Sequence, residues 1–325
     1  MKTIAIVATG GTIAGTGKKG KTAAYHAGEI DIDSIIETIP EINEVAHIKE
    51  YQLMNIDSNE MTHGKWLILK NNIEEILSDD TIDGAVVTHG TDTLDETAYF
   101  LTLTLNTPKP VVLTGAMRPA TATSADGPFN LYQAICLACH GESYNRGVLA
   151  LFSNTIYSGR DIEKVNNFKI DAFDQRSLGC LGYMQDQEVY FYTQTSKIHT
   201  IKSRFNKRID SIKSVAIAFY YSGADAKILY DLASDHEGIV IAGSGSGNYS
   251  QAWLKAIEEL SEKGTIFVRS SRISQGIVFD DEIFDPHHLC ISSNTLSPQK
   301  ARVLLMLALT QTHDRDEIRE IFLQY

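Results

Sequence analysis

Short apolar runs that end in glycine-rich polar turns recur along this chain of 325 residues, and amphipathic stretches lie between them. Strands that alternate with helices in this way predict a mostly parallel, doubly wound α/β sheet. The elements predicted in the first half are strands at Thr3–Ala8, Gly84–Thr88, Val111–Thr114 and Val148–Phe152, and helices around Trp66–Leu77, up to Phe100 and at Asp126–Cys139.

The pattern weakens between residues 191 and 212, where several lysines and arginines gather, and we interpret this stretch as a linker. The elements predicted after it are strands at Val215–Tyr220, Gly238–Ala242 and Thr265–Arg269, and helices at Pro298–Gln311 and Arg315–Gln324. Proline suits the first turn of a helix, where its missing N–H is not needed. We therefore expect a large N-terminal α/β domain over residues 1–190 and a smaller α/β domain over residues 213–325.

Composition and charge exclude several classes of partner. The formal net charge is −12, and like-charge repulsion argues against nucleic acid or an anionic membrane surface. No apolar run approaches the roughly 18 residues of a membrane span. The first residues lack the long apolar region of a signal peptide, so we expect a cytoplasmic protein, or a periplasmic one supplied without its leader. Four cysteines fit reduced thiols better than a disulfide framework.

Two polar clusters stand where apolar runs end. Thr9-Gly10-Gly11-Thr12 follows the first predicted strand, and Thr88–Asp92, which reads Thr-His-Gly-Thr-Asp, ends another. Ligands of open parallel sheets bind outside the carboxyl ends of strands, so both clusters should face one crevice. A threonine hydroxyl beside glycine N–H groups is a candidate nucleophile with an oxyanion site prepared. Either cluster alone is better read as a tight turn, but two together favour a site.

Five motifs carry a family resemblance that spans essentially the whole chain. They are TGGTIAG at Thr9–Gly15, THGTDT at Thr88–Thr93, GAMRP at Gly115–Pro119, SADGP at Ser124–Pro128 and PQKARV at Pro298–Val303. In order and spacing they resemble the bacterial type II L-asparaginases. The resemblance implies a two-domain fold, a homotetramer built as a dimer of tight dimers, and hydrolysis of asparagine to aspartate and ammonia. It implies a threonine ester intermediate, minor glutaminase activity, and no cofactor or metal.

The same resemblance assigns individual residues. The implied catalytic residues are Thr12 as nucleophile, Tyr25 from a mobile lid, Thr91, Asp92, Lys164 and Glu282. The implied substrate-binding residues are Gly11, Ser58, Asn59, Gly90, Thr91, Asp92, Ala116 and Asn248. In this family Asn248 and Glu282 come from a neighbouring subunit. A threonine needs a base, which a Thr91–Lys164–Asp92 relay and a Thr12–Tyr25–Glu282 relay would supply. The residues alone do not rank the two threonines.

The sequence departs from the family at three places. Asn59 stands where glutamine or glutamate is common, and its shorter arm should reach the substrate amino group differently. Ser246 replaces a usual asparagine two residues before Asn248. The segment between Arg272 and Leu296 is one residue shorter, so Glu282 is placed by the pattern Glu-Ile-Phe-Asp.

Other readings of the same residues remain as alternatives. A glutaminase-asparaginase is the nearest, and a non-catalytic small-ligand binding protein would not need the full catalytic set. Gly15–Thr22 is a literal P-loop match, so a nucleotide-binding protein is the alternative from another class. Cys136–His140 matches a haem attachment pattern but lies in a predicted amphipathic helix, which favours two core cysteines. His287-His288 is better read as an exposed turn than as a metal pair, because no further ligands cluster nearby.

Overall fold

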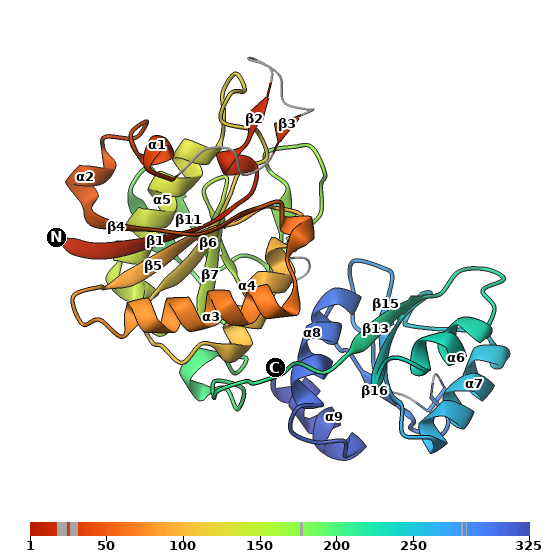
Figure 1. Ribbon diagram of the computed structural model, residues 1–325. Helices are drawn as coiled ribbons and strands as arrows, with labels where there is room; N and C mark the ends of the chain where they lie inside the picture. The colour runs from red at the N-terminus through yellow and green to blue at the C-terminus, as the bar shows by residue number, and fades with distance from the viewer. Residues whose placement is uncertain (18–24, 27–31, 176–177, 281, 284) are drawn as a thin grey trace. The chain divides into compact units, whose positions relative to one another are not determined.

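The structure is a computed structural model that describes residues 1–17, 25–26, 32–175, 178–280, 282–283 and 285–325. The chain forms two compact units, Met1–Lys207 and Arg208–Tyr325, and each is described by itself (Figure 1). Each unit contains a sheet with helices packed against it. The predicted class, a two-domain α/β fold with a large, mostly parallel sheet and a smaller second sheet, is confirmed.

The sheet of the first unit has the strand order β12-β11-β8-β7-β6-β5-β1-β4. Its strands are β1 Lys2–Gly10, β4 Ala46–Ile56, β5 Gly84–Thr88, β6 Val111–Thr114, β7 Val148–Phe152, β8 Thr155–Ser158, β11 Gly182–Gln185 and β12 Glu188–Phe191. Neighbours from β7 to β4 pair in parallel, whereas β8, β11 and β12 pair antiparallel. The carboxyl ends of the five parallel strands therefore meet at one edge.

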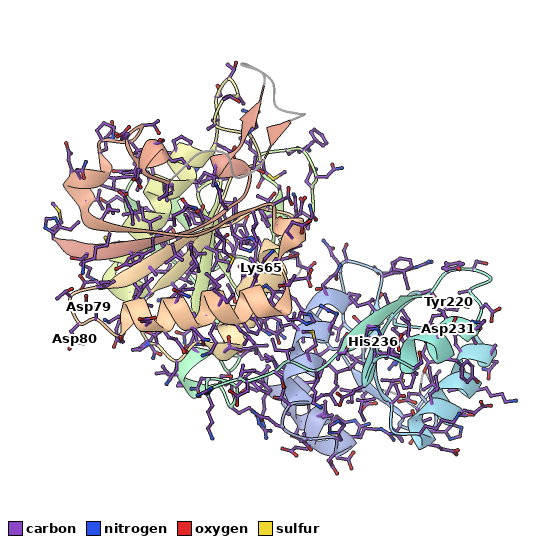
Figure 2. The ribbon with its side chains drawn as sticks, viewed as in Figure 1. Lys65, Asp79, Asp80, Tyr220, Asp231 and His236 are labelled. Carbon is purple, nitrogen blue, oxygen red and sulfur yellow. The ribbon has the colours of Figure 1, made fainter. Side chains whose placement is uncertain are left out.

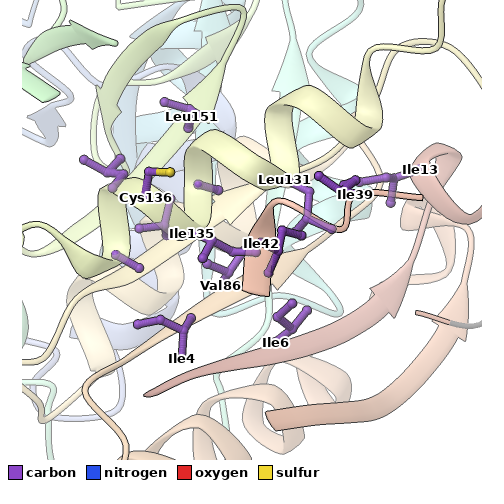
Figure 3. Packing of buried hydrophobic residues seen from close by; sticks show 14 of the residues in the cluster. Ile4, Ile6, Ile13, Ile39, Ile42, Val86, Leu131, Ile135, Cys136 and Leu151 are labelled. Atoms are coloured by element: carbon purple, nitrogen blue, oxygen red, sulfur yellow. The ribbon is translucent and has the colours of Figure 1, made fainter. Parts of the chain in front are cut away.

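Helices cover both faces of this sheet (Figure 1). These helices are α1 Ile32–Ile36, α2 Ile42–Val45, α3 His63–Leu77, α4 Leu94–Thr104 and α5 Gly127–Cys139. The unit also contains the short 3-10 turns η1 Thr12–Ala14, η2 Ser58–Glu60, η3 Gly141–Ser143 and η5 Thr200–Lys202. Figure 3 shows Leu131 and Ile135 of α5 packed over Ile4 and Ile6 of β1. Trp66 of α3 stacks on Phe100 of α4 with ring centroids 5.1 Å apart, which joins the two helices.

The second unit is a four-stranded parallel sheet in the order β13-β14-β15-β16. Its elements are β13 Val215–Phe219, α6 Lys227–Ala233, β14 Gly238–Gly243, α7 Gln251–Glu262, β15 Ile266–Ser271, β16 Cys290–Ser292, α8 Pro298–Ala308 and α9 Arg315–Gln324. Tyr220, Asp231 and His236, labelled in Figure 2, belong to this unit. Trp253 of α7 is fully buried and donates through Nε1 to Ala224 O over 3.0 Å, so α7 is fixed to the loop that follows β13.

The first unit extends beyond the predicted boundary at residue 190. Strand β12 pairs with β11 up to Phe191, and η5 begins at the buried Thr200. Phe205 is buried as well. The strand pairing and the two buried side chains belong to the first unit, which ends at Lys207, inside the stretch interpreted as a linker. In the described part of the chain, no helix is long and apolar enough to cross a membrane.

Candidate active site

The turns after β1 and β5 lie against each other. The two strands pair in parallel with Ala8 opposite Thr88, and Thr9 Oγ1 donates to Thr88 O over 2.8 Å. Gly11 has φ 84°, and a Cβ there would come within 2.4 Å of Gly90 N. Only glycine permits this backbone approach. The two clusters therefore lie against each other through their backbones.

A third segment, η2, completes this contact from the end of β4. Ser58 is buried, and a Cβ at Gly90 would come within 2.8 Å of Ser58 Oγ. Thr93 Oγ1 donates to Ser58 O over 2.8 Å. Lys65, which stands near the start of α3 in Figure 2, donates through Nζ to Glu60 O over 2.7 Å. These bonds fix Ser58 beside Gly90.

Lys164 reaches the Thr91–Asp92 turn from a distant part of the chain. Its Nζ lies 2.8 Å from Thr91 Oγ1 and 2.5 Å from Asp92 Oδ1. Thr91 is buried, whereas the Asp92 side chain is 56% exposed and the Lys164 side chain only 15%. One amine therefore bridges a buried hydroxyl and a carboxylate that opens to solvent.

A short ribbon positions Lys164. Strand β9, Glu163–Lys164, pairs antiparallel with β10, Phe173–Asp174. Upstream, a Cβ at Gly159 would come within 3.0 Å of Ala98 O, so this turn packs tightly on α4. The buried Arg160 forms an ion pair with Asp161 next to it. The ribbon is thus anchored on the helix that follows Asp92.

Thr12 and Ala116 stand on neighbouring turns. Thr12 opens η1 and is buried, and its carbonyl accepts from Gly15 N over 2.9 Å. A Cβ at Gly127 would come within 2.8 Å of Ile13 and 3.2 Å of Ala116, so α5 presses the two turns together. The Thr12 turn is in this way held from both sides, by Gly90 through Gly11 and by α5 through Ile13.

The electrostatics of the cluster favour an ionised Asp92. The hydrogen bond from Lys164, against an opposing contribution from burial, lowers the pKa of Asp92 below its usual value. Asn59 adds to this through Nδ2, which lies 3.4 Å from Asp92 Oδ2. Nδ2 also donates to Asp57 Oδ1 over 2.8 Å, so both amide hydrogens of Asn59 face carboxylates. The arrangement presents a carboxylate to a cationic ligand group.

Three predicted site residues lie outside this cluster as described. The backbone of Tyr25 belongs to β3 Tyr25–His26, which pairs with β2 Thr16–Gly17. Most of the predicted lid over residues 15–28, and of the P-loop match within it, lies outside the described residues. Asn248 and Glu282 belong to the second unit. Asn248 N donates to Ser244 O over 2.7 Å, and Glu282 is an exposed side chain 3.7 Å from His288 Nε2.

The remaining sequence motifs lie in structural elements outside this cluster. Cys136 and Cys139 lie on α5, where burial raises the pKa of their thiols to about 12 and about 11. The glycine-rich loop that follows β14, which reads Gly-Ser-Gly-Ser-Gly from Gly243 to Gly247, closes on itself, since a Cβ at Gly243 would come within 2.3 Å of Gly247 C. Across the described residues, no group of three or more His, Cys, Asp or Glu side chains could hold a metal ion.

Sequence reasoning missed residues that hold the site in place. Asp57 caps η2 by accepting from Asn59 N over 2.8 Å, and an aspartate before a short helix is a recognisable capping signal. Asp126 accepts from Met117 N and Arg118 N, both over 2.9 Å, and thereby fixes the turn after Ala116. Nothing in the local sequence pairs Asp126 with that turn, because the bonds join two separate motifs.

Comparison with known proteins gives matches over almost the whole chain. Residues 3–197 match the family model described as asparaginase, N-terminal, and residues 214–322 match the glutaminase/asparaginase C-terminal domain. A solved structure from Campylobacter jejuni, titled as a probable cytoplasmic L-asparaginase, superposes with a TM-score of 0.94 at 44% identity. The superposition covers 100% of both chains.

Curated relatives agree with this assignment. A Haemophilus influenzae protein named probable L-asparaginase periplasmic is 44% identical over 98% of this chain and 92% of its own length. The Escherichia coli protein named L-asparaginase 2 is 41% identical, over 99% and 93%. A Pseudomonas fluorescens protein named glutaminase-asparaginase is 38% identical, over 99% and 90%. By the family models, the sequence identity and the fold, this chain belongs to the asparaginase family.

Proposed function

We propose that this protein is an L-asparaginase, which hydrolyses the side-chain amide of L-asparagine to aspartate and ammonia. The observation that carries the proposal is the place of Lys164 Nζ, 2.8 Å from Thr91 Oγ1 and 2.5 Å from Asp92 Oδ1. Thr91 and Asp92 lie on the turn that packs against the Thr12 turn through Gly11 and Gly90, and Lys164 reaches this turn from β9. Two hydroxyls, an amine and a carboxylate suffice for amide hydrolysis by a covalent route.

The proposed reaction has two steps. The Thr12 oxygen attacks the amide carbon, its proton leaves to a base, and the amide nitrogen takes up a proton and departs as ammonia. A β-aspartyl ester remains on Thr12, and water then cleaves it to aspartate and the free hydroxyl. In the Thr91–Lys164–Asp92 arrangement, Lys164 in its neutral form can take up the proton of Thr91 Oγ1, and the ionised Asp92 stabilises the charged lysine that results. Tyr25 and Glu282 are proposed as the relay of Thr12.

The proposed substrate contacts divide by charge. The exposed Asp92 carboxylate binds the substrate ammonium, and its lowered pKa keeps it ionised. Ser58 Oγ and the N–H groups of Gly90 and Thr91 bind the substrate carboxylate and the developing oxyanion, because backbone donors near glycine reach anions closely. Gly11, whose own N–H donates to Ile56 O over 3.0 Å, lines the site with its backbone. Ala116 lines the pocket beside Ile13. Asn59 and Asn248 of the neighbouring subunit are the further proposed contacts of the substrate ammonium group.

The test is ammonia release from asparagine and from glutamine at equal concentrations. We expect asparagine to give the higher kcat/KM, with glutamine reduced by roughly 10- to 200-fold, the discrimination that one methylene allows. Lys164→Met should lower kcat by about a hundredfold or more. Lys169→Met, an exposed lysine that follows the same strand, is the matched control. No ammonia from either amide would refute the proposal, and a higher kcat/KM for glutamine would favour a glutaminase-asparaginase.

We also propose that the working protein is a homotetramer, a dimer of dimers with sites shared between subunits. The side chain of Glu282 is 83% exposed, and the tight Ser244–Asn248 loop projects a backbone that another chain can approach. Residues 213–325 would then serve the neighbour's site. We propose a cytoplasmic location, as in the name of the Campylobacter jejuni protein, whereas the Haemophilus influenzae name says periplasmic. Cell fractionation with an antibody distinguishes the two compartments.

A further inference from the structure

His89 lies behind the turn that carries Thr91 and is fully buried. Its Nδ1 is 2.7 Å from Gly90 O, and its Nε2 is 3.0 Å from Thr97 Oγ1 on α4. Trp66 Nε1 on α3 donates to the same Thr97 hydroxyl over 2.9 Å. A chain of three hydrogen bonds thus leads from α3 through α4 to the Gly90 carbonyl.

The hydrogen-bond partners and the burial of the ring together select one protonation state. A carbonyl oxygen accepts and never donates, so His89 Nδ1 carries the proton that binds Gly90 O. The indole of Trp66 only donates, so Thr97 Oγ1 accepts from it and keeps one lone pair and its own proton for His89 Nε2. Burial lowers the pKa of His89 to about 4, so the ring is neutral at neutral pH. With its one hydrogen on Nδ1, the neutral ring accepts from Thr97 Oγ1 at Nε2.

The bond to Gly90 O controls more than one atom. The Gly90 carbonyl and the Thr91 N–H share one planar peptide unit, so holding the oxygen also sets the direction of that N–H. The next atom along the chain is the Cα of Thr91, whose Oγ1 accepts from Lys164. Gly90 itself is confined between Gly11 and Ser58. A misplacement of about 1 Å in such a site costs roughly a hundredfold in rate.

We propose that His89 is a positioning residue for the amide hydrolysis: its neutral ring holds the Gly90–Thr91 peptide, and Thr97 and Trp66 hold the ring. The role rests on the proposed function of the site. His89 acts through this peptide, because its ring is fully buried and cannot reach a substrate in solvent. The same ring links Thr97 of α4, and through it Trp66 of α3, to the Thr91 turn.

Two substitutions at position 89 distinguish the hydrogen bond made by Nδ1 from the one made by Nε2. The amide nitrogen of asparagine lies where Nδ1 lies, so His89→Asn keeps the donor to Gly90 O. Glutamine places its amide where Nε2 lies and loses that donor. In His89→Gln we expect kcat for asparagine to fall about a hundredfold below wild type, with KM nearly unchanged. In His89→Asn we expect kcat to be about tenfold higher than in His89→Gln. Equal kcat values in the two folded variants would overturn the proposal.

A second pair tests the support of the ring. Thr97→Val removes the hydroxyl between Trp66 and His89, and Thr97→Ser restores it. The control is Thr104→Val, also buried on α4, whose hydroxyl donates to Phe100 O of its own helix over 2.8 Å. We expect kcat to fall about tenfold in Thr97→Val and to stay within about twofold of wild type in Thr97→Ser and Thr104→Val. Equal effects in Thr97→Val and Thr104→Val would mean a purely structural role and would contradict the proposal.

A third measurement does not depend on activity. In wild-type protein with ¹⁵N-labelled histidine, the His89 ring should show the neutral Nδ1–H form at pH 7. A charged ring, or a proton on Nε2, would refute the proposal even if asparagine is hydrolysed. If wild-type protein releases no ammonia, the proposed function fails by itself, while the ring signature still reports whether the hydrogen-bond chain exists.

Discussion

Asn59 is the residue at which this site differs most directly from the pattern it resembles. Both of its amide hydrogens face carboxylates, those of Asp57 and Asp92, so the side chain is fixed close to the place proposed for the substrate ammonium. Glutamine at this position would extend one methylene further toward the substrate. Under the proposed function, the shorter side chain would leave room for a longer substrate.

Asn59→Gln should therefore lower the relative use of glutamine. We expect the ratio of kcat/KM for glutamine to that for asparagine to fall by about tenfold, since a methylene in a pocket is worth about 1–3 kcal/mol. The measurement is ammonia release from each amide in the purified variant. A ratio that rises, or stays unchanged, would show that Asn59 does not set the length of the pocket.

The lowered pKa of His89 also predicts how the free energy of unfolding depends on pH. Its folded pKa of about 4 lies below the unfolded value near 6.5, so between these values the unfolded chain binds more protons. Stability is therefore lost as pH falls from about 6.5 toward 4, by about 2 kcal/mol at pH 5 from this residue alone. His89→Gln removes the titrating group. Its melting temperature should drop less than that of wild type between pH 7 and pH 5, and equal drops would contradict the linkage.

At the scale of residues, the sequence predicts which side chains could carry out the chemistry, but it does not predict which of them contact one another. Thr91 and Asp92 stand in a recognisable strand-end motif, and Lys164 was predicted from the resemblance. The bond from Lys164 to Asp92 joins residues 72 positions apart, so no local spacing predicts it. The roles of these residues stay predictions. The His89–Thr97–Trp66 chain went unpredicted because its members look like ordinary core residues in the sequence.

At the scale of elements, burial decided what could be predicted. Strands β5, β6 and β7 were predicted with the bounds that the structure gives, because they are buried on both faces and form unbroken apolar runs. Strand β4 was missed because it lies at an edge, where exposed and charged side chains interrupt its pattern. The antiparallel strands β8, β11 and β12 are only four residues long and leave little signal.

The contact between the β1 and β5 turns is the element-scale feature on which the site depends. Gly11→Ala would force a methyl group into the Gly90 backbone at a positive φ. We expect activity to be lost and the melting temperature to fall, at a cost of about 1–3 kcal/mol. Gly64→Ala, in the first turn of α3 with only Thr62 Oγ1 at 3.9 Å, should leave activity intact and raise stability slightly. A fully active Gly11→Ala enzyme would contradict this view of the turn.

At the scale of the whole molecule, shared sites can be tested without a structure of the assembly. Thr12→Ala and Glu282→Ala chains should each be nearly inactive. In a mixed dimer with exchanged sites, one site carries both defects and the other carries neither. Co-expression should therefore restore activity, up to one intact site per heterodimer. If verified heterodimers stay inactive, Glu282 does not act across subunits.

The central claim is that a threonine of the first turn carries out the attack, and Thr12→Val tests it most directly. The substitution removes the hydroxyl and keeps the branched shape of the side chain. With asparagine as substrate, ammonia release should fall by several orders of magnitude, because the covalent step then lacks its attacking oxygen. The melting temperature should stay close to that of wild type. Near-normal ammonia release from the folded Thr12→Val protein would contradict the account.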